Sequence, residues 1–114
     1  MRRALLAFIT IIVAACTESM LDPLPLAVTV APNKSTTAPR DTITFRVTAQ
    51  GGSLVGVLID YADSSSDQFA TSGARTAELT FHHAYSTAGT YEVTVTLTDA
   101  LAGEKKATTE IRVN

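Results

Sequence analysis

The chain has 114 residues, which is enough for one hydrophobic core and no more. Nine basic residues stand against eleven acidic ones, and there is no tryptophan. This nearly balanced charge argues against a nucleic-acid partner, because a phosphate backbone is bound through a clear excess of Lys and Arg.

Residues 1–15 have the three parts of an export signal. Arg2 and Arg3 come first, residues 4–13 form an apolar run interrupted only by Thr10, and Ala14 and Ala15 follow. The apolar run is shorter than the roughly 20 residues that a helix needs to cross a bilayer, so we expect a cleaved signal rather than a permanent span. Removal of this signal, which contains Arg2 and Arg3, leaves seven basic residues against eleven acidic ones, a net charge of −4.

Cys16 is the only cysteine and therefore has no partner for an internal disulfide. The segment VAAC at residues 13–16 resembles the end of a bacterial lipoprotein signal. This resemblance implies lipid attachment at the Cys16 thiol, cleavage before Cys16 and acylation of the new amine. Several acyl chains would anchor the protein stably in a membrane. Thr17 in the following position implies the outer membrane, with the domain facing the periplasm or the outside. The alternative is an ordinary secretory signal that ends near a cysteine.

Residues 16–25 are short, lack a periodic pattern and contain two prolines, which predicts a lipidated tether. From residue 26 onward, apolar and polar residues alternate, as in half-buried strands. The alternating apolar positions are Leu26, Val28, Val30; Ile43, Phe45, Val47; Ala77, Leu79, Phe81; Tyr91, Val93, Val95, Leu97; and Ile111, Val113. LVGVLI at residues 54–59 is a continuous apolar run, which predicts a central strand covered on both faces.

Turn-forming segments separate these runs, among them GGS at 51–53, DSSSD at 63–67 and TSG at 71–73. No stretch has a helical period. About seven short strands within some ninety residues predict an all-β fold, an immunoglobulin-like Greek-key sandwich of antiparallel strands over residues 26–114.

Two segments resemble the PKD domain, an immunoglobulin-like sandwich of extracellular proteins. Residues 83–99, HAYSTAGTYEVTVTLTD, are similar to the family pattern H-x-Y-x-x-x-G-x-Y-x-V-x-[VL]-x-[VL]-x-D. Gly89 then supplies the turn into a strand, Tyr85 occupies the first tyrosine position, and Tyr91 ties the corner by a hydroxyl bond to nearby backbone. IDYADS at 59–64 stands where the family has W-D-F-G-D-G. Ala62 and Ser64 replace the glycines, which makes any turn with positive φ more costly.

Asp60, Asp63 and Asp99 are the candidate calcium ligands, because some PKD domains resemble calcium modules with carboxylates gathered at one end of the sandwich. Calcium takes six to eight oxygens, and this spacing matches no self-sufficient loop. The alternative is that each carboxylate accepts backbone hydrogen bonds within its own turn, so that the protein needs no cofactor.

His82 and His83 are adjacent, and adjacent residues on a strand point to opposite faces, so they are not expected to chelate one ion. The sequence lacks hydrolase, metalloprotease and phosphate-loop motifs, which predicts a protein that is not an enzyme.

Phe69, in the polar segment SDQFATSG, is expected to be an exposed contact in a loop. We therefore expect a membrane-tethered envelope module that binds a protein or a polysaccharide. The alternative is a structural spacer, or the remnant of a larger surface protein, with no ligand of its own.

Overall fold

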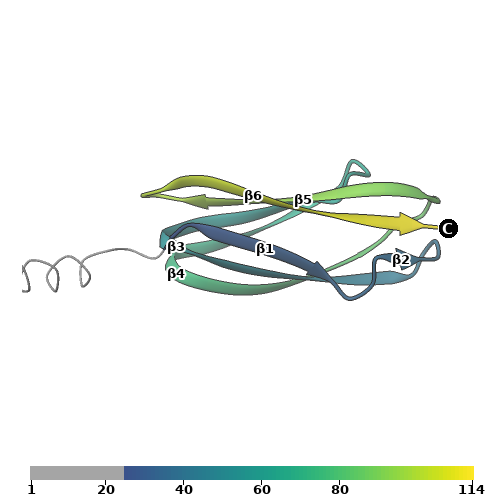
Figure 1. Ribbon diagram of the computed structural model, residues 1–114, viewed down its shortest axis with the longest axis horizontal. Helices are drawn as coiled ribbons and strands as arrows, with labels where there is room; N and C mark the ends of the chain where they lie inside the picture. Colours follow the sequence, from purple (N-terminus) through teal and green to yellow (C-terminus); the bar gives the residue numbers. More distant parts are fainter. Residues whose placement is uncertain (1–24) are drawn as a thin grey trace, which may run out of the picture.

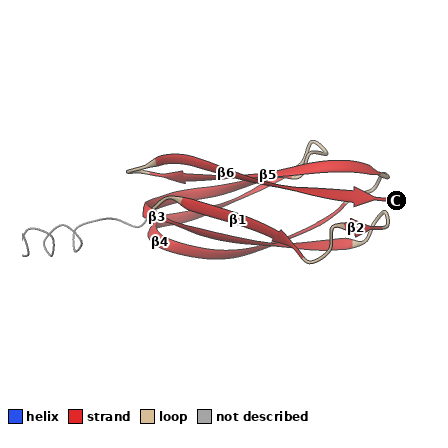
Figure 2. Ribbon diagram, viewed as in Figure 1, coloured by secondary structure: helices blue, strands red, loops and turns tan. Residues whose placement is uncertain are grey.

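The computed structural model describes residues 25–114, and these residues form strands joined by turns (Figures 1 and 2). Cys16 and most of the predicted tether lie outside this range. No helix long and apolar enough to cross a membrane occurs in the described part of the chain. The strands are β1 (Ala27–Pro32), β2 (Thr36–Thr37), β3 (Thr42–Asp60), β4 (Ser66–Ala84), β5 (Gly89–Asp99) and β6 (Gly103–Val113).

The strands form two layers because β3 and β4 each take part in both. Residues 42–50 of β3 pair with residues 76–84 of β4, and residues 45–50 also pair with β1. Farther along β3, residues 54–60 pair with β5, and residues 56–60 pair with residues 66–70 of β4. The paired β3–β4 ribbon therefore folds over on itself at one end of the molecule (Figure 1). We call the layer with β1 the first sheet and the layer with β5 and β6 the second sheet.

The fold-over occurs at the glycine-containing segments that the sequence analysis predicted as turns. The β3–β4 pairing is irregular between Gln50 and Gly56. On β4, Ser72 and Gly73 have φ values of 51° and 83°, a left-handed backbone that turns the strand. The seven predicted strands thus correspond to six continuous ones, two of which serve both sheets. The predicted antiparallel pairing also has one exception, because β2 pairs with β6 in parallel.

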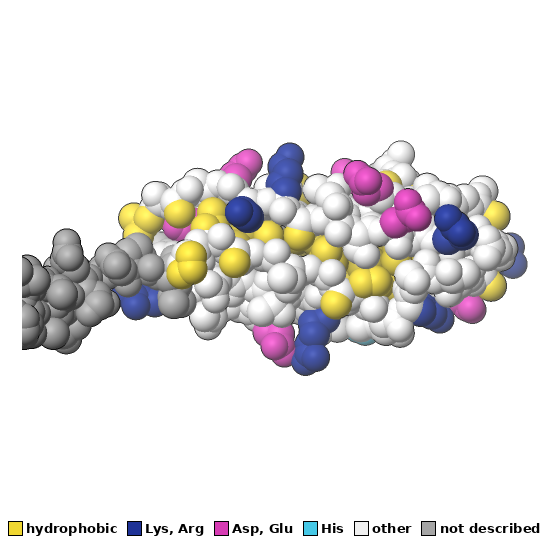
Figure 3. Space-filling view, in the orientation of Figure 1, with side chains coloured by type: hydrophobic (Ala, Val, Ile, Leu, Met, Phe, Trp, Pro, Cys, Tyr) yellow, Lys and Arg dark blue, Asp and Glu magenta, His cyan; other side chains and the backbone are white. Residues whose placement is uncertain are grey.

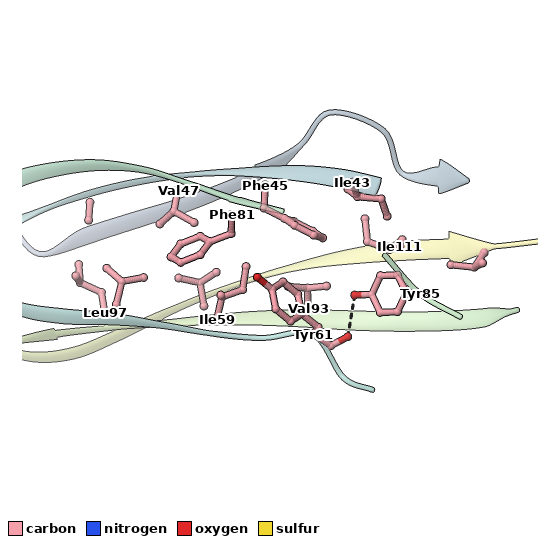
Figure 4. Packing of buried hydrophobic residues seen from close by; sticks show 14 of the residues in the cluster. Ile43, Phe45, Val47, Ile59, Tyr61, Phe81, Tyr85, Val93, Leu97 and Ile111 are labelled. Carbon is pink, nitrogen blue, oxygen red and sulfur yellow. Dashed lines mark hydrogen bonds between the residues drawn. The ribbon is translucent and has the colours of Figure 1, made fainter. Parts of the chain in front are cut away.

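The core lies between the two sheets and follows the alternating positions of the sequence. Fifteen apolar side chains are buried there, with Leu26, Val28, Val30, Ala77, Leu79 and Tyr91 packed against them. Figure 4 shows ten of them labelled, pointing into one interior from both layers: Ile43, Phe45, Val47, Ile59, Tyr61, Phe81, Tyr85, Val93, Leu97 and Ile111.

The surface seen in Figure 3 carries both kinds of charge, scattered on either side of a band of apolar side chains. This band follows the line where β1 of the first sheet approaches β6 of the second (Figures 1 and 3). The mixed charge agrees with the balanced composition and offers no single-sign field for steering a polyanion.

One expectation from the sequence is wrong. The segment 54–59 is a central strand of the second sheet, between β4 and β5, but only its inner face is covered. Val57 and Ile59 are buried, whereas Val55 is 51% exposed and Leu58 is 41% exposed. Continuous apolar sequence therefore reflects an uncovered outer face here, not a second covering layer.

Candidate functional site

The loop between β3 and β4, residues 61–65, is built by its own carboxylates. Asp60 Oδ1 accepts the Ala62 N–H at 2.9 Å, and Asp63 Oδ1 accepts the Ser65 N–H at 3.2 Å. The Tyr61 N–H donates to the Ser65 carbonyl and closes the loop. These are the local side-chain bonds that Asp forms in turns, as the turn alternative for Asp60 and Asp63 predicted.

His83 lies over this loop. Its Nε2 is 2.7 Å from Asp63 Oδ2, and its ring stacks on that of Tyr61 with centroids 3.9 Å apart. Burial alone would raise the pKa of the Asp63 carboxyl, but the Ser65 hydroxyl and His83 hold that pKa below its usual value. His82 instead contacts the Thr44 hydroxyl through Nδ1. The two histidines thus have separate partners, as expected for neighbours on a strand.

Two further tyrosines fix the loop to the core, and the first of them, Tyr85, meets the His83 ring edge to face with centroids 4.7 Å apart. The Tyr85 hydroxyl, which is buried, donates to the Tyr61 carbonyl at 2.8 Å (Figure 4). The ring of Tyr85 stacks on that of Tyr91 at 4.1 Å, and the Tyr91 hydroxyl donates to the Thr87 carbonyl at 2.7 Å. Gly89 begins β5, and a Cβ at that position would stand 3.7 Å from the Tyr91 ring, an ordinary contact distance. This is the corner that the motif at residues 83–99 suggested.

Both buried phenols are held in their neutral form. Burial, and then the Asp67 carboxylate that accepts its hydrogen bond at 2.7 Å, raises the pKa of Tyr61. Burial, and then the nearby Asp63 carboxylate, raises the pKa of Tyr85. Neither phenol is therefore a base at neutral pH, which fits structural donors rather than catalytic groups.

Ser65, His83 and Asp63 lie together but do not have the geometry of a catalytic triad. In a triad the acid and the nucleophile contact opposite nitrogens of the histidine ring. Here Asp63 Oδ2 at 2.7 Å and Ser65 Oγ at 3.5 Å both approach Nε2. In addition, the Ser65 hydroxyl donates to the Asp63 carboxylate. The arrangement holds the loop and provides no activated hydroxyl.

Asp99 lies at the other end of the sandwich. It ends β5 opposite Leu54, whereas Asp60 lies opposite Thr94. Its carboxylate accepts the backbone N–H groups of Ser53, Leu101 and Ala102 at 2.6, 3.0 and 2.8 Å.

The side chain of Asp99 is 2% exposed, and burial alone would raise its pKa, but these N–H groups hold the pKa below its usual value. Asp99 therefore fixes the β5–β6 turn on the fold-over of β3. Gly51 makes this possible, because a Cβ at that position would stand 2.7 Å from the Asp99 carboxylate.

The three aspartates suggested as calcium ligands therefore do not converge. Asp60 and Asp63 share one loop, whereas Asp99 belongs to a different turn. Within residues 25–114 there is no group of three or more His, Cys, Asp or Glu side chains that could hold a metal ion. Each of the three aspartates accepts a backbone hydrogen bond with at least one carboxylate oxygen.

Phe69 is 53% exposed, as the sequence analysis expected, but it lies on strand β4 and not in a loop. It borders a groove of about 410 Å³ on the second sheet. The groove is lined by Val55, Gly56, Val57, Leu58, Gln68, Phe69, Ala70, Thr96, Thr98 and Glu104.

The groove opens on the outer face of the second sheet. Leu58 is paired with Gln68 and Thr96, and residues paired across strands share a face. The neighbouring Val57 is buried, so Leu58 and its partners point outward. Phe69 is paired with Val57 and therefore belongs to the opposite face of β4, so it borders the groove only at the edge of the sheet. Gly56 leaves the floor without a side chain, and a Cβ there would stand 3.2 Å from the Phe69 carbonyl oxygen.

The sequence analysis singled out Phe69 but missed Val55 and Leu58, which share the groove. The available signal was the continuous apolar run at residues 54–59. Together these three residues are three of the four large apolar side chains that are exposed in the described residues, the fourth being Leu101. Their gathering around one hollow distinguishes them from scattered surface residues.

Comparison with known proteins identifies the family. The family model of the PKD domain matches residues 27–113, so this chain belongs to the PKD domain family. Domains of this type are often binding or structural modules. No curated protein matches the chain.

Solved structures share the fold. The PKD domain of an M14-like peptidase from a Thermoplasmatales archaeon has 20% identity and a TM-score of 0.69, covering 81% of this chain and 98% of that one. The PKD domain of the human VPS10 domain-containing receptor SorCS2 has 18% identity and a TM-score of 0.56, covering 81% and 74%. A CARDB domain from Pyrococcus furiosus, solved in complex with di-metal ions, has 16% identity and a TM-score of 0.59, covering 78% and 92%.

Proposed function

We propose that this protein is a lipid-anchored, non-enzymatic interaction module of the bacterial cell envelope. In this proposal Cys16 carries the lipid in the outer membrane, and the PKD domain binds an envelope protein or polysaccharide. The groove around Leu58 on the outer face of the second sheet, bordered by Phe69 at its edge, is the binding surface.

The groove is the observation that carries the proposal. Its border is apolar, with Val55, Leu58 and Phe69 each at least 41% exposed. Its lining also contains the polar side chains of Gln68, Thr96, Thr98 and Glu104. An apolar surface with a few hydrogen-bonding groups is typical of a binding site, because the apolar part provides affinity and the polar part orientation.

The anchor is supported by the signal-like residues 1–15 and by the sequence VAAC at residues 13–16. Mass spectrometry of the mature N-terminus tests it directly. We expect a chain that begins at Cys16 and carries a diacylglycerol and an additional acyl group. A free Cys16 thiol, or cleavage at a different residue, contradicts the anchor.

The binding surface is tested by capture from envelope fractions, with proteins and polysaccharides analysed separately. Leu58→Glu places a charge in the groove and should abolish specific capture. The control is Thr76→Glu, which introduces the same side chain at an exposed position of β4 in the first sheet, where Thr76 is paired with Gln50. This variant should leave capture intact. If the unaltered protein captures no partner of either kind, the spacer alternative is favoured.

A further inference from the structure

The turn between β5 and β6 has an unusual composition for an exposed turn. Residues 100–103 have the sequence ALAG, and all four are exposed. Leu101 is 75% exposed, the highest value among the exposed large apolar side chains of residues 25–114. Exposed turns usually contain Asn, Asp or Ser, whose side chains bond the local backbone. This turn instead offers only methyl groups, a leucine side chain and backbone.

The backbone donors of this turn are already satisfied inside the protein. The Ala100 N–H donates to the Ser53 carbonyl at 2.8 Å. The N–H groups of Leu101 and Ala102 both donate to Asp99. Unpaired backbone N–H groups are part of the cost of placing a turn in an apolar medium, and these three bonds remove that part. The turn therefore exposes an apolar surface, and its paired N–H groups favour transfer from water into an apolar medium.

The turn lies at the end of the domain where the chain enters from its N-terminal segment (Figure 1). The Pro25 carbonyl accepts a hydrogen bond from Gln50, and a Cβ at Gly51 would stand 3.1 Å from the Leu26 side chain and 2.7 Å from the Asp99 carboxylate. Pro25 is nine residues beyond Cys16. A chain of that length reaches at most about 30 Å, so lipid on Cys16 would keep this end near the membrane.

The charges beside the turn favour an anionic surface. Lys105 and Lys106 follow the turn on β6, and Arg75 follows the fold-over of β4 at the same end; all three are exposed. Glu104 is the exposed carboxylate in this group. The carboxylate of Asp99 is buried beneath the turn and is bound by backbone N–H groups. Basic residues near an anionic phospholipid surface attract its headgroups.

We propose that the β5–β6 turn is a membrane contact, in which Leu101 inserts into the lipid surface and Lys105 and Lys106 meet anionic phospholipid headgroups. The inference rests on the proposed function in one respect: the anchor at Cys16 brings the turn to the membrane. A single leucine gives weak insertion alone, but once the chain is anchored the contact is intramolecular and its effective concentration is high. The contact orients the domain with the far loops, including residues 61–65, away from the lipid.

The test uses tryptophan fluorescence, because the chain contains no tryptophan of its own. Leu101→Trp places a single reporter in the turn. Ser86→Trp places a matched reporter on the exposed turn between β4 and β5, at the opposite end. Both full chains are expressed in a bacterial host, purified from its membranes and reconstituted into vesicles that contain phosphatidylglycerol.

We expect the emission of the Leu101→Trp protein to shift to the blue and to be quenched by lipids brominated near the headgroup. The Ser86→Trp protein should show neither change. Adding Lys105→Glu to Leu101→Trp should lower the ratio of inserted to free turn about fivefold or more, the equivalent of about 1 kcal/mol per basic residue. Lys34→Glu, at a partly exposed position between β1 and β2, is the charge control.

Water-like emission from Leu101→Trp, in a protein whose mass shows lipid on Cys16, overturns this inference and leaves the anchor intact. Equal blue shifts at both positions also overturn it, because they indicate contact without orientation. If the mass shows no lipid, the anchor fails instead. The chain from Cys16 onward is then coupled through its thiol to a maleimide phospholipid, and the same two reporters decide whether the turn inserts.

Discussion

Replacing Ala62 and Ser64 by glycine should stabilise the domain. These residues have φ values of 68° and 73°, in the left-handed region that an L-residue occupies at a cost of about 1–2 kcal/mol. Glycine removes this cost but adds about 0.5–1 kcal/mol through the greater freedom of the unfolded chain. The net gain is about 0.5–1 kcal/mol for each substitution. The hydrogen bonds of this loop from Ala62 and Ser65 use backbone N–H groups, so both substitutions leave them in place.

The measurement is urea unfolding of the two single variants and the double variant. We expect the midpoint to rise with an unchanged slope, since the surface exposed on unfolding is the same. For a domain of this size, each kcal/mol corresponds to about 4–8 °C in Tm. The control is Ala88→Gly, at an exposed turn residue without positive φ, which should lower the midpoint. If both loop variants are neutral or destabilised, then left-handed strain at Ala62 and Ser64 is not a significant cost and the reasoning is refuted.

Three further predictions concern the polar groups of the two ends. Tyr85→Phe should destabilise by about 1–3 kcal/mol in urea unfolding, because it leaves the buried Tyr61 carbonyl without its donor; a neutral result would contradict this bond. The pKa of Asp63 is lower in the folded state than in the unfolded chain, where it is about 4. The carboxylate therefore stabilises the fold above about pH 4, and this stabilisation is lost as the pH falls through the folded-state pKa. Asp63→Asn should accordingly flatten the acid side of a plot of Tm against pH. Tm should not respond to millimolar calcium or to a chelator, because Asp60, Asp63 and Asp99 do not converge. A calcium site would instead raise Tm, by an amount that corresponds to about 2.7 kcal/mol of unfolding free energy when calcium is at a hundredfold excess over Kd, and such a rise would contradict this geometry.

The sequence predicted the fold well because alternation has a direct physical cause. Positions such as Phe45, Val47 and Val95 alternate with polar residues, and all three are buried. The turn motifs were equally readable, since glycine at residues 51–52 and 73 marks where the ribbon changes sheets. The sequence could not show that one strand serves both sheets, because pairing partners are a property of the folded arrangement.

The candidate site was harder to predict because it depends on which face stays open. Leu58 has the same apolar character as its buried neighbours Val57 and Ile59, and only the absence of a covering layer makes it a surface residue. The aspartates show the same limit. Asp60 and Asp99 look alike in sequence, yet they lie opposite Thr94 and Leu54, positions at different ends of the second sheet.

The folded-over ribbon also has a consequence for how the chain folds. Its pairing starts beside the short loop at residues 61–65, where Asp60 meets Ser66, and continues to Thr42 and Ala84. Each new pair can form next to one that already exists, so the largest ladder of the molecule can grow without a search between distant segments. Closing long loops is the slow step in most sandwich folds, and this ribbon avoids it for two of its strands. We therefore expect the β3–β4 ribbon to form early and β1 and β6 to add to it later.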